Sequence, residues 1–168
     1  MVSEDKIVSF LNLQQIVLDI EDSGKIIDQF LPKVLTELNS IGYSYIFLSA
    51  IFIDTAQAIK QSFFTDNNPE TLGGVTKADN LFQKGREWEM KVMYGEAAVV
   101  SDVGYFVNSS YAQFSKIKSI LILPIQHARA LTGVLVLGSS KEAEKTDADE
   151  IEFTKMITRL VDLAFRLQ

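Results

Sequence analysis

Apolar residues in the last third of the chain form two short, unbroken runs. The first covers residues 120–125 and the second covers residues 133–138, with residues 127–130 between them. Short apolar runs bounded by turn residues are typical of strands that are covered on both faces. We therefore predict two adjacent strands joined by a loop over residues 127–130, with an apolar layer on each side of their sheet.

Apolar residues at steps of three and four predict two helices near the start of the chain. The break between them falls at residues 21–24, where Ser23 is the expected N-cap of the second helix. Pro32 either kinks this second helix or marks its true beginning, and Gly42 belongs to the signal that ends it. The apolar positions are Phe10, Leu13, Val17 and Ile20, followed by Ile27, Phe30 or Leu31, Val34 and Leu38.

The middle of the chain predicts further strands and a third helix. Residues 43–53 are aromatic or aliphatic almost throughout, which predicts the first and most central strand. The mixed run 56–64 predicts a neighbouring strand nearer the edge of the sheet, followed by a turn-rich loop over residues 65–74. Helical spacing of the apolar residues over 76–93 predicts a third helix, which Gly95 stops.

The remaining segments complete the expected fold. Val99 and Val100 predict a short strand, Asn108 is a suitable cap for a brief helix, and residues 151–167 show helical spacing. The acidic residues that open this last helix stabilise its N-terminus by about 0.3–1 kcal/mol each. The order of elements predicts an α+β fold: an antiparallel sheet of five or six strands, with the N- and C-terminal helices on one face and a helix and loop layer on the other.

Composition limits the class of protein and its partners. Of the 168 residues, 47% are hydrophobic, enough for one substantial core, so we expect a single domain over residues 1–168. A net charge of −6 weighs against nucleic acid or an anionic membrane as a partner. No apolar run approaches the roughly 20 residues that span a bilayer, and the N-terminus lacks a signal-peptide pattern, so we expect a cytoplasmic protein.

The sequence offers no convergent set of catalytic groups. It contains no cysteine, which excludes thiol chemistry, and its only histidine, His127, is expected to be an exposed loop imidazole. We therefore predict no catalytic residue, no metal site, no cofactor and no enzymatic activity. The weaker alternative of an enzyme would have to use Asp102, Tyr105, Tyr111 and His127, which nothing in their spacing brings together.

Several segments together resemble the GAF domain family. The sequence "LPI" at 123–125, "GVLVL" at 133–137 and an acidic-headed helix follow one another as at the end of a GAF domain. Residues 95–102 look like the middle strand of the family and the aspartate that follows it. The resemblance covers nearly the whole chain. It implies a profilin-like sandwich that binds a small molecule and acts as the sensory or regulatory domain of a signal-transduction protein.

The sequence departs from three groups within that family. Bilin-binding GAF domains usually hold their chromophore through a cysteine, and stand-alone GAF enzymes that reduce free methionine sulfoxide use cysteine chemistry, which this chain lacks. GAF domains that bind cyclic GMP carry Asn-Lys, then Phe, then Asp-Glu, where this chain has Ser140, Lys141, Lys145, Asp149 and Glu150. We therefore disfavour cyclic nucleotide binding and expect Lys141 and Asp149 to form a structural salt bridge.

The resemblance places a ligand on the sheet face that is covered by the third helix and by the segment around Asp102. The candidate ligand-binding residues, which supply aromatic walls and one carboxylate, are Trp88, Asp102, Tyr105, Phe106, Tyr111 and Phe114. The same side chains would equally suit the edge of a plain core.

The resemblance also implies the partners of the chain. We expect an unidentified small-molecule ligand, a homodimer formed through the apolar terminal helices, and an output domain of a signalling protein. Residues 1–22 would form the helix suited to dimerisation or signalling. The alternative is a ligand-free dimerisation or interaction domain of the same fold, in which Trp88, Phe106 and Phe114 fill the space that a ligand would take.

Overall fold

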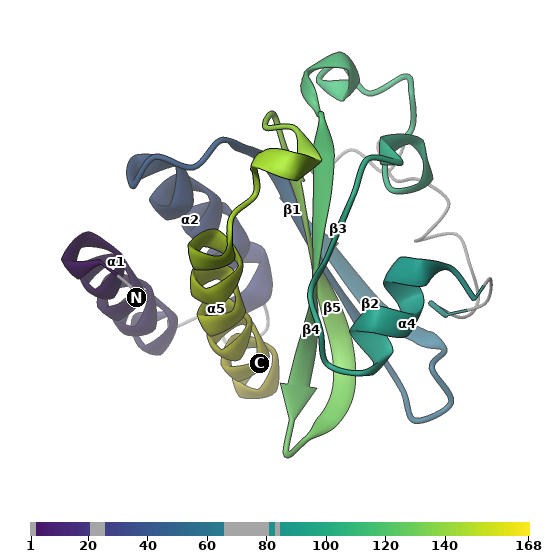
Figure 1. Ribbon diagram of the computed structural model, residues 1–168. Helices are drawn as coiled ribbons and strands as arrows, with labels where there is room; N and C mark the ends of the chain where they lie inside the picture. The colour runs from purple at the N-terminus through teal and green to yellow at the C-terminus, as the bar shows by residue number, and fades with distance from the viewer. Residues whose placement is uncertain (1–2, 21–25, 66–80, 83–84) are drawn as a thin grey trace.

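The computed structural model of the chain describes residues 3–20, 26–65, 81–82 and 85–168. Within these ranges, five strands form one sheet that has helices on both faces (Figure 1). The expected Ser23 cap and nearly all of the expected loop 65–74 lie outside the described residues. The strands are β1 (Tyr45–Ile53), β2 (Ile59–Phe64), β3 (Ala98–Val100), β4 (Ser119–His127) and β5 (Ala130–Ser139).

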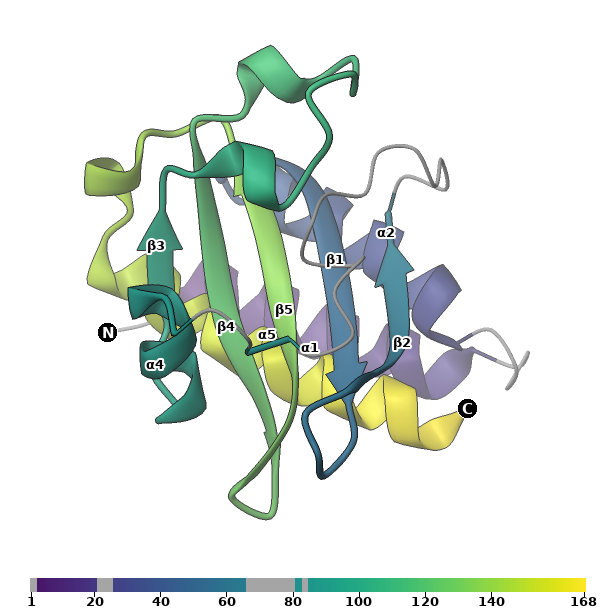
Figure 2. The same ribbon diagram turned by 90° about the vertical axis from the view of Figure 1, so that its right-hand side faces the viewer.

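The strand order is β2-β1-β5-β4-β3, and every neighbouring pair is antiparallel (Figure 2). The predicted antiparallel sheet is confirmed, and β2 lies at an edge as its mixed sequence indicated. The prediction that residues 43–53 form the most central strand is wrong, because β5 pairs with both β1 and β4 and takes the middle position. Gly133 of β5 allows close approach to β1, since an added Cβ would lie 2.3 Å from the Ile51 carbonyl oxygen.

The predicted hairpin between β4 and β5 is confirmed, but its turn is tighter than expected. Ala128 and Arg129 both have positive φ, at 50° and 68°, as a two-residue type I′ turn requires. His127 therefore pairs with Ala130 at the strand ends and does not lie in a loop. The prediction of a loop over residues 127–130 is corrected accordingly.

Helices cover the two faces of the sheet unequally (Figure 1). One face carries α1 (Glu4–Asp19), α2 (Ile26–Ser40) and α5 (Ala148–Leu167), and the other carries α4 (Glu87–Met93) with short 3-10 turns. This confirms the predicted α+β sandwich with both terminal helices on one side. Pro32 lies inside α2, so it does not mark the beginning of that helix.

The sheet separates two apolar cores, as its continuously apolar strands predicted. Leu48, Ala50 and Phe52 of β1 join the core beneath α1, α2 and α5. Phe47 and Ile51, on the opposite face of the same strand, join the core beneath α4. Alternate residues of a strand point to opposite faces, so one apolar run contributes to both cores.

The single helix expected over residues 76–93 is corrected, because the described residues 81–82 and 85–86 are not helical and α4 begins at Glu87; residues 76–80 and 83–84 lie outside the described part of the chain. Gly85 has a φ of +63°, a left-handed conformation that an α-helix does not contain. At the other end, Gly95 has a φ of +82° and stops the helix as expected. Asn108 does not cap a helix: its side chain accepts a hydrogen bond from the Ser110 amide, and the backbone forms a turn.

Candidate functional site

An aromatic cluster occupies the sheet face beneath α4. The Trp88 ring lies 6.3 Å from Tyr105 and 5.5 Å from Phe106, measured between centroids, and the Tyr105 and Phe106 rings are 5.4 Å apart. Trp88 and Phe106 are buried, whereas Tyr105 is half-buried. Phe82 adds a further ring 6.3 Å from Trp88. Three of the predicted ligand-binding residues are therefore in mutual contact.

Tyr111 and Phe114 lie further along the same face. Both are partly buried and pack against the core that contains Trp88 and Phe106. They follow β3 in a segment of turns, with a short 3-10 helix at Phe114–Lys116. These two residues are therefore on the predicted face of the sheet and outside the contacting trio of rings.

Asp102 lies at the edge of this cluster and takes part in an ion pair that the sequence did not indicate. Its Oδ2 atom is 3.5 Å from Nη1 of Arg86, and its side chain is 66% exposed. The Arg86 guanidinium also stacks over the Tyr105 ring, 3.7 Å from the centroid. Sequence reasoning missed Arg86 because its partners lie 16 and 19 residues further along the chain, with no periodic pattern to connect them.

Burial raises the pKa of Tyr105, and the adjacent Arg86 guanidinium opposes this by lowering it. The phenol is therefore neutral and able to donate a hydrogen bond at physiological pH. Arg86 and Tyr105 together present one cation and one hydroxyl beside the buried rings. This combination could orient a planar molecule that carries a hydrogen-bond acceptor or a negative charge.

Trp88 holds a buried donor for which the described part of the chain supplies no acceptor. Its Nε1 atom has no hydrogen-bond partner among the described residues, and only 6% of the residue is exposed. A buried polar group left unpaired costs about 1–3 kcal/mol. Buried indole nitrogens usually find an acceptor, so an unpaired one calls for an explanation.

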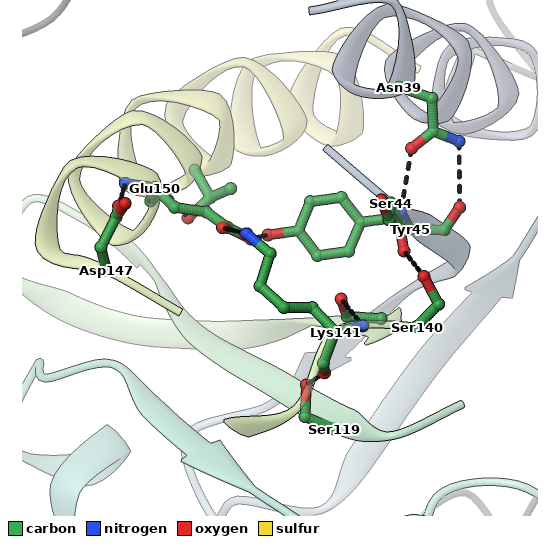
Figure 3. Close-up of polar contacts among 10 residues, drawn as sticks. Asn39, Ser44, Tyr45, Ser119, Ser140, Lys141, Asp147 and Glu150 are labelled. Carbon is green, nitrogen blue, oxygen red and sulfur yellow. Dashed lines mark hydrogen bonds and ion pairs between the residues drawn. The ribbon is translucent and has the colours of Figure 1, made fainter. Parts of the chain in front are cut away.

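A second polar cluster ties the strand ends to α5 (Figure 3). Nζ of Lys141 lies 2.7 Å from Oε1 of Glu150, and the Tyr45 hydroxyl donates a hydrogen bond to the other carboxylate oxygen of Glu150. The Glu150 side chain is only 2% exposed. The prediction that Lys141 pairs with Asp149 is corrected, because Glu150 is the residue of that acidic pair that points inward.

The backbone around this cluster is fixed by further hydrogen bonds. The Ser119 hydroxyl donates to the Lys141 carbonyl at 2.6 Å, and the Asn39 side chain both donates to and accepts from the backbone of Tyr45 (Figure 3). Asp147 caps α5 by accepting from the Glu150 amide at 2.8 Å. Every one of these contacts is internal, so the partial match to the cyclic-GMP pattern has a structural explanation.

No group of three or more His, Cys, Asp or Glu side chains in the described part of the chain is placed to hold a metal ion. None of the described helices is both long and apolar enough to cross a bilayer.

Comparisons with known proteins define the class of fold. No protein-family model and no curated protein matches the sequence. Among solved structures, the chain is similar to the GAF domain of A. aeolicus nlh2 in an inactive state, at 17% identity and a TM-score of 0.58, covering 97% of this chain and 96% of that one. It is also similar to the GAF domain of an Acinetobacter phosphoenolpyruvate-protein phosphotransferase, at 12% identity and a TM-score of 0.63, covering 98% and 95%. The chain therefore has a GAF-like fold, as its sequence resemblance indicated.

Enzymes are also among the structural neighbours. The free methionine-R-sulfoxide reductase of Neisseria meningitidis, in complex with its substrate, has 16% identity and a TM-score of 0.56, covering 99% of this chain and 93% of that one. Further reductases of this kind share the fold. The prediction that the chain is not an enzyme is therefore wrong, because enzymes are among the proteins that share its fold. The chain nevertheless contains no cysteine, so a thiol-based reduction has no thiol to use.

Proposed function

We propose that this chain is a sensory or regulatory domain that binds a small molecule on the sheet face beneath α4. The observation that carries the proposal is the buried Trp88 Nε1 atom, which has no hydrogen-bond partner among the described residues. A ligand that supplied an acceptor there would remove the cost of the unpaired donor. The surrounding rings of Tyr105 and Phe106 would contact its apolar part.

The ligand favoured by these groups is planar and carries a carbonyl or carboxylate oxygen. Its oxygen would accept from the Trp88 indole, and Arg86 at the edge of the cluster would attract a negative charge. The Arg86 guanidinium is already shared between Asp102 and the Tyr105 ring, so it is held in place before a ligand arrives. Such preorganisation lowers the entropic cost of binding.

A thermal-shift screen of nucleotides, amino acids, 2-oxo acids and aromatic metabolites tests the proposal. Binding to the native state raises the melting temperature, and the shift grows with ligand concentration. Trp88→Phe keeps a ring and removes the N–H. It should weaken ligand affinity about tenfold and so reduce or abolish the shift in melting temperature. Tyr94→Phe, at a residue that is 78% exposed, is the matched control. A complete absence of stabilising ligands would count against the proposal.

A dimerisation role is the second candidate, and the surface of α1 favours it. Ile7, Val8, Leu11 and Leu18 are 47%, 51%, 54% and 58% exposed. At 3.6 residues per turn these four positions fall within an arc of about 100°, opposite the buried face formed by Leu13 and Val17. Helix α1 is thus apolar on two sides, and a second copy of the chain would cover the outer one.

Analytical ultracentrifugation tests the dimer. We expect a species of twice the 18.8 kDa chain mass at micromolar concentration. The double variant Leu11→Glu and Leu18→Glu should sediment as a monomer, because it places charges in the centre of the apolar stripe. Asn12→Glu, on an exposed position of α1 outside the stripe, should leave the dimer intact. A wild-type monomer at high micromolar concentration would contradict this second role.

A further inference from the structure

A cavity lies on the side of the sheet opposite α4, where α5 ends beside the hairpin ends of the strands. Its volume is about 180 Å³. It is formed by the end of β1, the start of β2, the hairpin ends of β4 and β5, and the last turns of α5. Figure 2 shows the end of α5 passing beneath β1 and β2. The residues that line the cavity are Phe52, Ile53, Lys60, His127, Thr132, Asp162, Phe165 and Arg166.

Three of these side chains form a connected polar group. Nη1 of Arg166 lies 3.0 Å from Nε2 of His127, and Nε of Arg166 lies 3.3 Å from Oδ2 of Asp162. A guanidinium only donates, so His127 Nε2 accepts and its proton is on Nδ1, which lies 3.7 Å from the same Asp162 oxygen. His127 is therefore positioned by two partners, which corrects its expected role as a plain loop imidazole.

The charges around the cavity favour an anion. Asp162 supplies the single carboxylate of the lining, whereas Lys60 and Arg166 supply two permanent positive charges. Lys60 forms no ion pair with any described residue, so its ammonium group is available to a ligand. A locally positive lining is notable in a chain whose net charge is −6. It would attract a small anion while the remaining surface repelled it.

The size and walls of the cavity limit what the anion can be. An engineered cavity of about 150 Å³ in another protein binds benzene, so about 180 Å³ accommodates one ring with a small substituent. Phe52 and Phe165 supply aromatic walls, with their rings in edge contact. An aliphatic anion would leave this apolar surface unused, and a nucleotide would be too large.

We propose that this cavity is a binding site for a small aromatic carboxylate, separate from the ligand face beneath α4. The ring lies against Phe52 and Phe165, and the carboxylate pairs with Lys60 and with the free edge of the Arg166 guanidinium. Asp162 and His127 hold that guanidinium in place from the other side. Because Phe165 and Arg166 belong to α5, a ligand here contacts the last turns of the long terminal helix directly.

Titration of the ¹⁵N-labelled chain with benzoate, followed by NMR, tests the proposal. We expect saturable shifts of the Thr132 and Phe165 amides with a midpoint independent of any shift of the Trp88 indole N–H, which reports on the opposite face. Benzamide keeps the ring without the charge, and acetate keeps the charge without the ring. Both should bind at least about tenfold more weakly than benzoate, because each lacks one class of contact.

Two variants distinguish specific binding in this cavity from nonspecific attraction of benzoate to surface lysines. Lys60→Gln should weaken benzoate binding about tenfold, whereas Lys33→Gln, at an exposed lysine of α2, should have no effect. Equal binding of benzamide or acetate, an equal loss in the two variants, or shifts at Trp88 without shifts at Thr132 would overturn the proposal. Each of these outcomes leaves the proposed function of the α4 face untouched, because that function has its own reporter in Trp88.

Discussion

The Lys141 ammonium lies 2.7 Å from Oε1 of Glu150, whose side chain is almost completely buried. This pair connects the segment just after β5 to the first turn of α5. The two elements are otherwise joined by residues 140–147, which include a short 3-10 helix. A buried carboxylate is stable only when it is paired and hydrogen-bonded, and here Tyr45 supplies the second contact. The position of α5 on the sheet therefore depends on this cluster.

Lys141→Met should destabilise the fold by about 3 kcal/mol or more, because it leaves Glu150 as an unpaired buried charge. Urea unfolding followed by circular dichroism measures the change. Lys145→Met removes an exposed lysine from the same segment and should change the free energy of unfolding by less than about 0.5 kcal/mol. Equal effects of the two substitutions would show that the pair contributes nothing.

Tyr45 should make the stability of the chain fall at alkaline pH. Burial, followed by the hydrogen bond to Glu150, raises the pKa of Tyr45 far above its usual value near 10. The unfolded chain therefore releases the phenolic proton first, so the stabilisation is complete below about pH 10 and is lost as the pH rises beyond it. Urea unfolding at pH 8 and pH 11 should show a smaller alkaline loss for Tyr45→Phe than for the wild type. An identical loss would contradict this assignment.

Gly133→Ala should be strongly destabilising, because the new Cβ would meet the Ile51 carbonyl oxygen at 2.3 Å and the backbone of β1 cannot yield without breaking strand pairing. We expect a loss of about 2 kcal/mol or more in the free energy of unfolding. Gly104→Ala is the matched control, since nothing lies within 4 Å of its added Cβ. A neutral Gly133→Ala would mean that β1 and β5 are less closely paired than described.

Arg86→Gln should raise the pKa of Tyr105 further above its ordinary value. The guanidinium now opposes the effect of burial, so its removal leaves burial uncompensated. Absorbance titration of tyrosinate, compared with the same titration of Tyr105→Phe, isolates this residue from the other four tyrosines. A lower pKa in Arg86→Gln, or no change, would show that the stacking contact is not maintained in solution.

Much of the fold was predictable because apolar periodicity reports burial directly. Patterns of apolar residues predicted three features correctly. These are the β4–β5 hairpin, the acidic-headed α5 and the apolar layers on both faces of the sheet. The late start of α4 was not predictable, because apolar spacing over 76–93 continued past Gly85 and gave no sign of its left-handed backbone. The central position of β5 depends on strand pairing, which residue pattern alone does not encode.

The site was only partly predictable, because contacts between residues far apart in the sequence are not visible in a residue pattern. Trp88, Tyr105 and Phe106 could be grouped because large aromatic residues near a covering helix tend to meet in the core. The partners of Arg86 and of His127 lie far along the chain, so only the folded structure brings Arg86 to Tyr105 and His127 to Asp162. The choice of Glu150 over Asp149 as the partner of Lys141 depended on the rotation of α5, which the adjacent acidic residues do not specify.

The most direct test of ligand sensing is the indole N–H resonance of Trp88 during a screen of planar carbonyl and carboxylate compounds. Trp88 is the only tryptophan, so the signal is unambiguous. We predict that at least one compound moves this resonance downfield in a saturable manner, as its oxygen accepts the unpaired hydrogen bond, and raises the melting temperature in parallel. An indole resonance that no compound moves, in a chain that remains folded, would contradict a ligand site on the α4 face.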